Sequence, residues 1–369
     1  MEKLKIGIIG CGGIANGKHM PSIKQLDNVE MVAFCDIIPE RAEKAAKEYG
    51  TADAKVYTDY KELLKDESIN NVRVLTQNNM HARISIDAMK AGKHVMCEKP
   101  MAMNYAEAKE MIKVSKETGK LLTIGYQHKF DPDVIYAKAE SEKGTFGDMY
   151  FAKANVVRRR GVPTWGVFTQ KSEQGGGSLI DIGTHALDIA LYLMNNYKPK
   201  MAVGSTYDKL KNNKETANPF GAWDVDKYDV EEAAFGYVTM ENGATIILEA
   251  TWALNTTDSA GIRYMVCGTE AGVDNYNGKF KLNGVCNDKM YVTEPDLNAG
   301  GVAFYEGSSS SPTVMEQQVF INAILGKGEL VTTPETAAVV TQILEGIYIS
   351  ANTGKPYYFK EEDNEQCLI

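Results

Sequence analysis

Three ionisable residues have the types and the sequence contexts of a proton-transfer site. Lys99 follows a short apolar run, and Asp181 and His185 lie four residues apart where a helix is predicted to open. Residues at i and i+4 are neighbours on a helix, and histidine titrates near neutral pH, so His185 is the candidate general base. Lys99 would stabilise an oxyanion, and Asp181 would orient the substrate or the base. Taken singly, they could equally be a structural histidine, a helix N-terminal charge and a surface lysine.

A glycine-rich turn, Gly10-Cys11-Gly12-Gly13-Ile14-Ala15, follows the first apolar run with the pattern G-x-G-x-x-A. Its first glycine permits a tight turn, its second lets the backbone approach a pyrophosphate, and the small Ala15 allows close helix-strand packing. Asp36 ends the next apolar run, near the spacing expected for the residue that binds the adenosine ribose hydroxyls. Because that carboxylate would repel a 2′-phosphate, NAD is predicted rather than NADP. Asp36 could instead cap a helix, and Arg41 could contact a phosphate or simply be exposed.

The elements that must position these residues alternate between short apolar runs and helical patterns as far as residue 125. Such alternation predicts a parallel sheet with right-handed crossovers, and ligands bind beyond the carboxyl ends of its strands, where Lys99 lies. The predicted strands are Leu4–Ile9, Val29–Asp36, Val56–Tyr57, Val72–Leu75, His94–Cys97 and Leu121–Gly125, and the predicted helices are Arg41–Tyr49, Ala82–Ala91 and Ala106–Thr118.

Longer alternating runs follow Tyr126 and predict an antiparallel sheet, closed by two late helices. Asn242-Gly243 between two of these runs predicts a hairpin with a type I′ turn. The domain boundary is therefore expected near residues 125–132, which gives domains 1–125 and 126–369. The predicted strands are Met149–Val157, Met201–Tyr207, Glu231–Met240, Ala244–Trp252 and Ile262–Gly268, and the helices are about Val314–Leu325 and Pro334–Ala351.

The composition of the 369 residues, 44% hydrophobic and 24% charged, is that of an ordinary globular protein. A net charge of −9 argues against a nucleic-acid partner. The six cysteines show no paired metal-ligand spacing, so no metal is predicted and the cysteines are expected to be buried thiols of a reducing compartment. No apolar stretch has the length of a signal peptide or a membrane span, which predicts a cytoplasmic protein without a membrane partner.

Two further motifs carry a resemblance to a known family. Glu98-Lys99-Pro100 matches an E-K-P motif, and Asp181-Ile182-Gly183-Thr184-His185 matches a D-x-x-x-H motif. With the glycine turn, they make the chain resemble the Gfo/Idh/MocA family, the glucose-fructose oxidoreductase and inositol dehydrogenase group, over essentially its whole length. The resemblance implies an α/β plus α+β fold. Residues 1–125 would form a Rossmann doubly wound parallel sheet that binds NAD, and residues 126–369 an open antiparallel sheet, flanked by helices, for substrate binding and homo-oligomerisation as a dimer, tetramer or higher assembly.

The resemblance also implies a reaction. The chain would be an NAD(P)-dependent dehydrogenase acting on CH–OH groups, which moves a hydride between nicotinamide and a secondary alcohol of a sugar, glycoside or cyclitol. The segment Arg158 to Phe168, followed by Gln174 to Gly177, resembles members that oxidise sugars and glycosides, so a carbohydrate is the predicted substrate. Two alternatives remain open: an enzyme that cleaves glycosides with retained NAD, and a non-catalytic NAD-binding regulator.

The predicted site is wider than its catalytic residues, Lys99, Asp181 and His185. Tyr126 and Trp165 would offer flat apolar surfaces to a sugar, or are ordinary core aromatics. Two departures from the family pattern concern the cofactor loop and one polar contact: Gln77 replaces the proline of T-P-N-x-x-H, and Lys129 stands where arginine is usual. The predicted cofactor-binding residues are Gly10, Gly12, Gly13, Ile14, Asp36, Ile37, Arg41, Thr76, Gln77, Asn78, His81, Glu98, Lys99 and Gln127, and the substrate-binding residues are Tyr126, Arg158, Trp165, Asp181 and His185.

Overall fold

A computed structural model of the chain describes residues 3–213, 215–297 and 311–360. The chain divides into two compact units, Met1–Phe130 with Ser308–Ala338 and Asp131–Gly307 with Val339–Ile369. Among the described residues, no helix combines the length and the apolar character that a membrane span requires.

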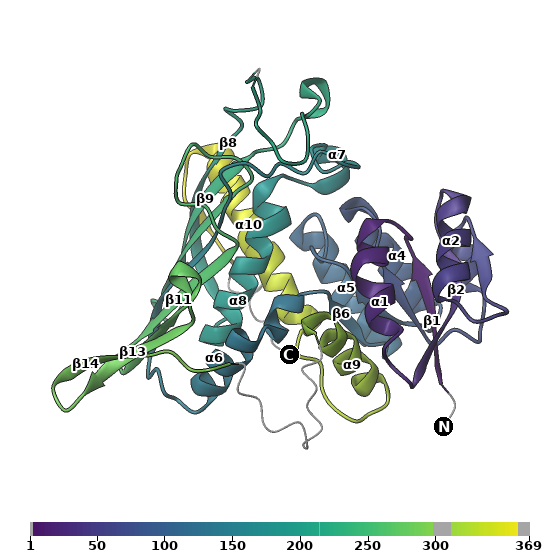
Figure 1. Ribbon diagram of the computed structural model, residues 1–369, viewed down its shortest axis with the longest axis horizontal. Helices are drawn as coiled ribbons and strands as arrows, with labels where there is room; N and C mark the ends of the chain where they lie inside the picture. The colour runs from purple at the N-terminus through teal and green to yellow at the C-terminus, as the bar shows by residue number, and fades with distance from the viewer. Residues whose placement is uncertain (1–2, 214, 298–310, 361–369) are drawn as a thin grey trace. The chain divides into compact units, whose positions relative to one another are not determined.

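The first unit is built on a six-stranded sheet in the order β3-β2-β1-β4-β5-β6 (Figure 1). Every neighbouring pair runs parallel, and the strand order reverses between β1 and β4, as in doubly wound dinucleotide-binding domains. The predicted parallel sheet is confirmed, and each predicted strand end lies within one residue of the observed one. The strands are β1 Leu4–Ile9, β2 Val29–Cys35, β3 Lys55–Tyr57, β4 Asn71–Val74, β5 His94–Cys97 and β6 Leu122–Ile124.

Helices connect these strands, and two of them begin at a side-chain cap. Asp59 accepts a hydrogen bond from the Lys61 N–H at the start of α3, and Asn104 accepts one from the Glu107 N–H at the start of α5. The short α3 was not predicted. The helical segments of this unit are η1 Ala15–His19, α1 Met20–Ile23, α2 Pro39–Tyr49, α3 Tyr60–Leu64, α4 Asn78–Lys90, α5 Tyr105–Thr118, η2 Gln127–Phe130 and α9 Pro312–Ile324.

Helix α9 belongs to the first unit although it lies far along the chain. Its Val314 and Ile321 share one apolar core with Met20, Ile23 and Leu75. The units therefore differ from the expected domains 1–125 and 126–369, because residues 126–130 and α9 pack with the N-terminal sheet. The apolar spacing of α9 predicts an amphipathic helix but does not say which sheet its apolar face will cover.

The second unit contains a nine-stranded sheet in the order β14-β13-β12-β11-β7-β10-β9-β8-β15. Its pairs are antiparallel except β7 with β10, so the sheet is mixed rather than purely antiparallel as expected. The connection after β7 includes a helix and is long enough to bring β10 parallel beside it. The strands are β7 Met149–Val157, β8 Pro199–Tyr207, β9 Ala233–Met240, β10 Thr245–Thr251, β11 Ile262–Gly268, β12 Ala271–Asp274, β13 Lys281–Cys286, β14 Lys289–Thr293 and β15 Tyr357–Tyr358.

Helices cover one face of this sheet, where Figure 1 shows α8 and α10. Helix α8 packs against β7 and β11. Ile347 of α10 lies so close to the sheet that a Cβ atom at Gly204 or Gly236 would come within 2.5 Å of its side chain. The helical segments are α6 Pro132–Glu142, α7 Lys171–Gln174, η3 Leu179–Gly183, α8 Thr184–Met194, η4 Val225–Lys227, η5 Tyr276–Gly278 and α10 Pro334–Thr353, within which the division between the units falls.

The predicted hairpin at Asn242-Gly243 joins β9 to β10, but its turn type was wrong. Gly243 has a φ of 88°, whereas Asn242 is absent from the residues with positive φ, and type I′ requires both. The Met240 N–H donates to the Ala244 carbonyl (2.8 Å), so the loop has an additional residue. Between β13 and β14, Asn287 and Asp288 have φ values of 51° and 58°, as type I′ requires.

The cysteines follow the prediction only in part. Cys11, Cys35 and Cys97 are buried free thiols, and Cys267 is half-buried. Cys286 is exposed, because it ends a strand of the projecting β13–β14 hairpin, and Cys367 lies outside the described residues.

Candidate active site

The glycine turn is tied to the end of β2 by one carboxylate. The Cys11 N–H donates to Asp36 Oδ2 (2.8 Å), and the Ile38 N–H donates to Asp36 Oδ1 (2.9 Å). Gly10 has a φ of 94°, and a Cβ there would lie 2.5 Å from the Leu75 carbonyl oxygen, so only glycine suits this position. The turn therefore has a fixed conformation, with Asp36 beside it at the carboxyl edge of the sheet.

The space beside Gly12 and Gly13 is open. A Cβ built at Gly12 or Gly13 meets no atom within 4 Å, so the protein's own packing does not require glycine there. A pyrophosphate that approached the backbone would occupy the open volume a side chain would otherwise fill. The aliphatic side chains of Ile14 and Ile37 are 44% and 79% exposed, and Arg41 is exposed in the first turn of α2. These residues would hold NAD through its pyrophosphate and its adenosine half.

A buried polar cluster lies behind the E-K-P motif. Glu98, which is 5% exposed, receives hydrogen bonds from Lys18 Nζ (2.8 Å) and the Lys99 N–H (2.9 Å). Lys18 also donates to Gln127 Oε1 (3.0 Å) and forms an ion pair with Glu316 of α9 (3.2 Å). Glu98 thus fixes the backbone at the candidate catalytic Lys99, and Lys18 fixes Gln127, a predicted cofactor-binding residue.

The same cluster determines the tautomer of His19. Gln317 Oε1 accepts from Arg73 Nε (2.7 Å), so the Gln317 amide nitrogen faces His19 Nδ1 (3.0 Å) as a donor. The His19 proton must then sit on Nε2, which lies 2.7 Å from Glu98 Oε1. A neutral His19 satisfies both contacts. Burial, together with the nearby Lys18, lowers the pKa of His19 to about 4, in agreement with this geometry.

The charges of this cluster balance when His19 is neutral. Lys18 and Arg73 then face Glu98 and Glu316, all of them buried. Burial raises the pKa of Glu98, but Lys18 and His19 outweigh it and hold that pKa well below its usual range. Burial raises the pKa of Glu316.

In the loop after β4, Gln77 stands where the family has a proline. Gln77 has φ −69° and ψ 156°, the φ that a proline ring would impose. His81 is 1% exposed, and its ring nitrogens lie 2.7 Å from the Pro100 carbonyl oxygen and 3.1 Å from that of Thr76. His81 therefore braces the loops after β4 and β5. Asn78 is buried, and Thr76 and Gln77 are half-buried.

Two neighbouring predictions fall on buried residues. Tyr126 is 1% exposed, with the Lys129 ammonium 5.7 Å from its ring centre, which favours the core role left open above. Lys129 is equally buried and donates to Thr332 Oγ1 (3.2 Å), so it serves the interior of the first unit where an arginine is usual.

In the second unit, Asp181 and His185 lie together where the π-helical η3 continues into α8. Trp252 Nε1 donates to Asp181 Oδ2 (3.0 Å) and so fixes the carboxylate. Asp181 is half-buried and His185 is 8% exposed. Single π-helical turns within helices are frequent at functional sites.

The start of this helix is held by Glu231, which sequence reasoning did not identify as a site residue. Its carboxylate accepts from the Gly177 N–H, the Leu179 N–H and the Tyr348 hydroxyl, each at 2.9 Å. Burial raises the pKa of Glu231. A charged pair, Glu231-Glu232, at the head of an apolar run was the available signal, whereas nothing distinguished Trp252.

The Gly175-Gly176-Gly177 run supports the same helix start. Gly175 has a φ of 82° and ends α7. A Cβ at Gly176 would collide with the Tyr348 hydroxyl, and one at Gly177 with the Glu231 carbonyl oxygen. The run is thus explained by close packing around Asp181 and His185.

Trp165 presents an aromatic surface in the second unit. It is 52% exposed, and the rings of Phe220 and Phe168 meet it edge to face at centroid distances of 4.8 and 5.7 Å. Arg158 is half-buried and donates from Nη1 to the Gly161 carbonyl oxygen (3.3 Å). Stacking against an exposed, buttressed ring suits the apolar face of a sugar.

Comparisons with known proteins agree with this description. Residues 4–126 match the Gfo/Idh/MocA oxidoreductase family with an NAD-binding Rossmann fold, and residues 134–274 match the Gfo/Idh/MocA C-terminal domain. The chain is 31% identical over 351 residues to D-glucoside 3-dehydrogenase of Escherichia coli, covering 95% of this chain and 96% of that protein. It is 28% identical to levoglucosan dehydrogenase of Pseudarthrobacter phenanthrenivorans over 76% of each chain.

Solved structures show the same fold. Levoglucosan dehydrogenase in complex with NADH and L-sorbose superposes with a TM-score of 0.82 at 22% identity, covering 98% of this chain and 100% of that one. The aldose-aldose oxidoreductase of Caulobacter crescentus superposes with a TM-score of 0.78 at 23% identity, covering 97% and 100%. With both family domains matched in order, the chain belongs to the Gfo/Idh/MocA family of NAD-binding oxidoreductases.

Proposed function

We propose that this oxidoreductase oxidises a secondary alcohol of a sugar or glycoside to the ketone. The observation that carries the proposal is the placement of Asp181 and His185 four residues apart where η3 continues into α8, with the Asp181 carboxylate held by Trp252 and the helix start held by Glu231. A protein that only bound NAD would not require this pair of acid-base residues. The names of two relatives, D-glucoside 3-dehydrogenase and levoglucosan dehydrogenase, support a carbohydrate substrate.

Each residue has a distinct task in this reaction. NAD, when bound, accepts a hydride from the carbinol carbon. His185 removes the hydroxyl proton as general base. The Lys99 ammonium stabilises the negative charge that develops on the oxygen, and Glu98 holds the Lys99 backbone for that role. Asp181, oriented by Trp252, orients the substrate or the imidazole.

Trp165 and Arg158 would recognise the sugar. Because the Trp165 ring is half-exposed and buttressed by Phe168 and Phe220, it offers a rigid apolar surface to the C–H face of a pyranose. Arg158, at the end of β7, offers guanidinium N–H groups to hydroxyl oxygens.

The test is incubation of the purified protein with NAD and a panel of sugars, cyclitols and glycosides, with NADH absorbance and product mass followed together. A product lighter than the substrate by two hydrogens is expected. NADH should either be released in an amount equal to that of the product or remain bound to the protein. Release of an aglycone and an unoxidised sugar, without an electron acceptor, would instead establish glycoside cleavage. The His185→Ala variant is the negative control.

We further propose that the chain forms homo-oligomers through the open face of the nine-stranded sheet. Val203 and Tyr237 are paired across β8 and β9 and exposed, and Tyr207 on the same face contacts Phe235. Exposed apolar side chains gathered on one face mark interaction sites. Tyr237→Lys should lower the mass measured by light scattering. Tyr150→Lys, on the opposite face of β7, is the matched control and should leave the mass unchanged.

A cytoplasmic location is also proposed, supported by the free thiols Cys11, Cys35 and Cys97. Fractionation of cells that produce the protein tests it, and recovery in an extracellular fraction would count against it.

A further inference from the structure

A second pocket lies at the end of the first sheet opposite the nucleotide edge. It is lined by residues at or just before the amino ends of β1, β4, β5 and β6, including Leu4, Asn70, His94 and Lys120. Gly10 and Lys99 follow the carboxyl ends of β1 and β5. Because β1 alone spans about 20 Å, this pocket is separate from the cofactor turn. Its volume of about 370 Å³ lies within the range of small-molecule sites.

Two lysines line this pocket, and their ammonium groups are only partly compensated by carboxylates. Lys93 is 4% exposed, and its ammonium donates to the Asp66 backbone carbonyl (2.7 Å). The Asp66 carboxylate is already engaged by Lys55 (2.7 Å) and Ser68 (2.7 Å). Within the described part of the chain, neither Lys93 nor Lys120 makes an ion pair. Burial lowers the pKa of Lys93, and the carboxylates of Asp66 and Glu67 offset that effect only in part. A buried lysine whose charge is only partly compensated favours a bound anion.

Two neutral donors complete the wall. His94 Nδ1 accepts from the Leu121 N–H (3.0 Å), which leaves the proton of the neutral ring on Nε2. Burial and the neighbouring Lys120 lower the pKa of His94, so the ring is neutral at pH 7. Asn70 Oδ1 is occupied by the Lys5 N–H (2.7 Å), which leaves its amide N–H groups as donors.

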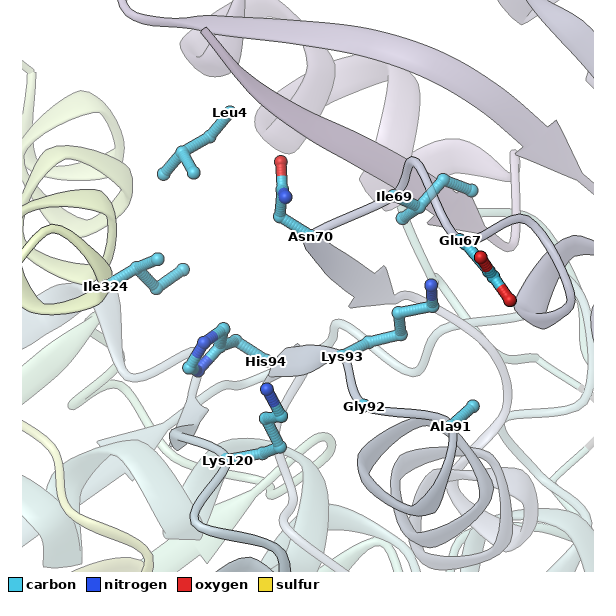
Figure 2. A pocket seen from close by; sticks show the side chains of 10 residues that line it. All are labelled: Leu4, Glu67, Ile69, Asn70, Ala91, Gly92, Lys93, His94, Lys120 and Ile324. Atoms are coloured by element: carbon cyan, nitrogen blue, oxygen red, sulfur yellow. The ribbon is translucent and has the colours of Figure 1, made fainter. Parts of the chain in front are cut away.

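Part of the wall is aliphatic. Leu4, Ile69 and Ile324, the last residue of α9, line the pocket beside the cationic groups. Figure 2 shows the Lys120 ammonium beside the His94 ring, with Ile324 and Leu4 on the same side of the view and Lys93 on the other side with Ile69. The Glu67 side chain stands at the rim with its carboxylate turned away from His94 and Lys120.

We propose that this pocket binds a phosphate monoester that carries a small uncharged body. The two lysines match the charge of roughly −2 that a phosphate monoester bears at pH 7, which a single carboxylate does not reach. His94 and Asn70 supply further donors to its oxygens, and the aliphatic wall accepts the body of the ligand. The proposal does not depend on the identity of the oxidised substrate.

Calorimetric titration of the NAD-saturated protein with inorganic phosphate and with glycerol 3-phosphate tests the site. Saturating NAD keeps both probes away from the glycine turn. We expect saturable binding of both probes, tighter for glycerol 3-phosphate, and no binding of acetate at equal ionic strength.

Lys120→Gln is the informative variant, because this half-buried lysine has no ion pair to lose on folding. It should weaken glycerol 3-phosphate binding by about tenfold or more, the usual effect of removing a charged hydrogen-bond donor. Lys120→Glu should abolish binding. Lys113→Gln makes the same charge change on exposed α5 and should leave the affinity unchanged. Absence of saturable phosphate binding, or equal affinity in Lys120→Gln and Lys113→Gln, would overturn the proposal.

Discussion

Replacing His19 by glutamine should flatten the pH dependence of stability of the first unit. In the folded protein the pKa of His19 is about 4, against 6.5 for the free side chain, because burial and Lys18 disfavour its charged form. The unfolded chain therefore takes up a proton first as the pH falls. Stability is present above pH 6.5 and is lost progressively as the pH falls toward 4.

The size of this effect follows from the shift. A difference of 2.5 pH units between 6.5 and 4 corresponds to about 3 kcal/mol of stability lost across the window. Glu316 acts in the opposite sense, because its raised pKa adds stability as the pH falls. Glutamine does not titrate, and its amide can still donate to Glu98. Comparing the two proteins therefore isolates the contribution of His19. Loss of the acceptor for Gln317 should add a constant cost of about 1–3 kcal/mol.

Hydrogen exchange of peptides from β1 and α9, corrected for the intrinsic pH dependence of exchange, measures this stability locally. The free energy of opening should fall more steeply toward low pH in the wild type than in His19→Gln. Peptides from α8 in the second unit serve as the internal control and should behave alike in both proteins. Parallel pH profiles for the β1 and α9 peptides would show that His19 is not held neutral.

The other predictions concern the cofactor and the chemistry. Asp36→Ser should reduce the ratio of NAD affinity to NADP affinity, measured by calorimetry. Equal affinities of the wild type for NAD and NADP would refute the proposed role of the Asp36 carboxylate in selecting NAD. Lys99→Ala and His185→Ala should each lower turnover by about 10²–10⁴-fold while NAD affinity changes little. Near-normal turnover of either variant would exclude a catalytic role for the residue replaced. Gly12→Ala should weaken NAD binding with unfolding stability within about 1 kcal/mol of wild type, whereas Gly10→Ala should cost more than about 1 kcal/mol. Thermal unfolding and NAD titration distinguish these two outcomes.

Most of the first sheet was predictable because β1, β2, β5 and β6 are largely buried apolar runs, and such runs are visible in sequence. The hairpin β13–β14 was not, since every residue of β14 is exposed and the strand has no alternation to detect. The Asn287-Asp288 turn was its only local signal. The parallel pairing of β7 with β10 depends on long-range topology, which periodicity does not encode.

The candidate site was predictable where backbone chemistry demands a residue type, as at Gly10, where φ is positive and the Leu75 carbonyl is close. It was not predictable where charge is buried. Lys18 and Arg73 resemble solvated charges in sequence, and part of what makes their burial tolerable, Glu316 and Gln317, is supplied by a distant helix. Glu231 was not predicted either, because its hydrogen-bond partners lie far from it in sequence, in the glycine run and in α10.

The dependence of the first unit on α9 has a consequence for synthesis on the ribosome. At about 5–20 residues per second, the chain between Phe130 and Pro312 takes roughly 10–40 s to make. Throughout that interval the nascent sheet carries Lys18, His19 and Arg73 without Glu316 and Gln317, and the core lacks Val314 and Ile321. The part of the protein translated first is thus completed almost last, and a fragment cut at residue 125 for expression would permanently lack Glu316, Gln317 and the apolar side chains of α9.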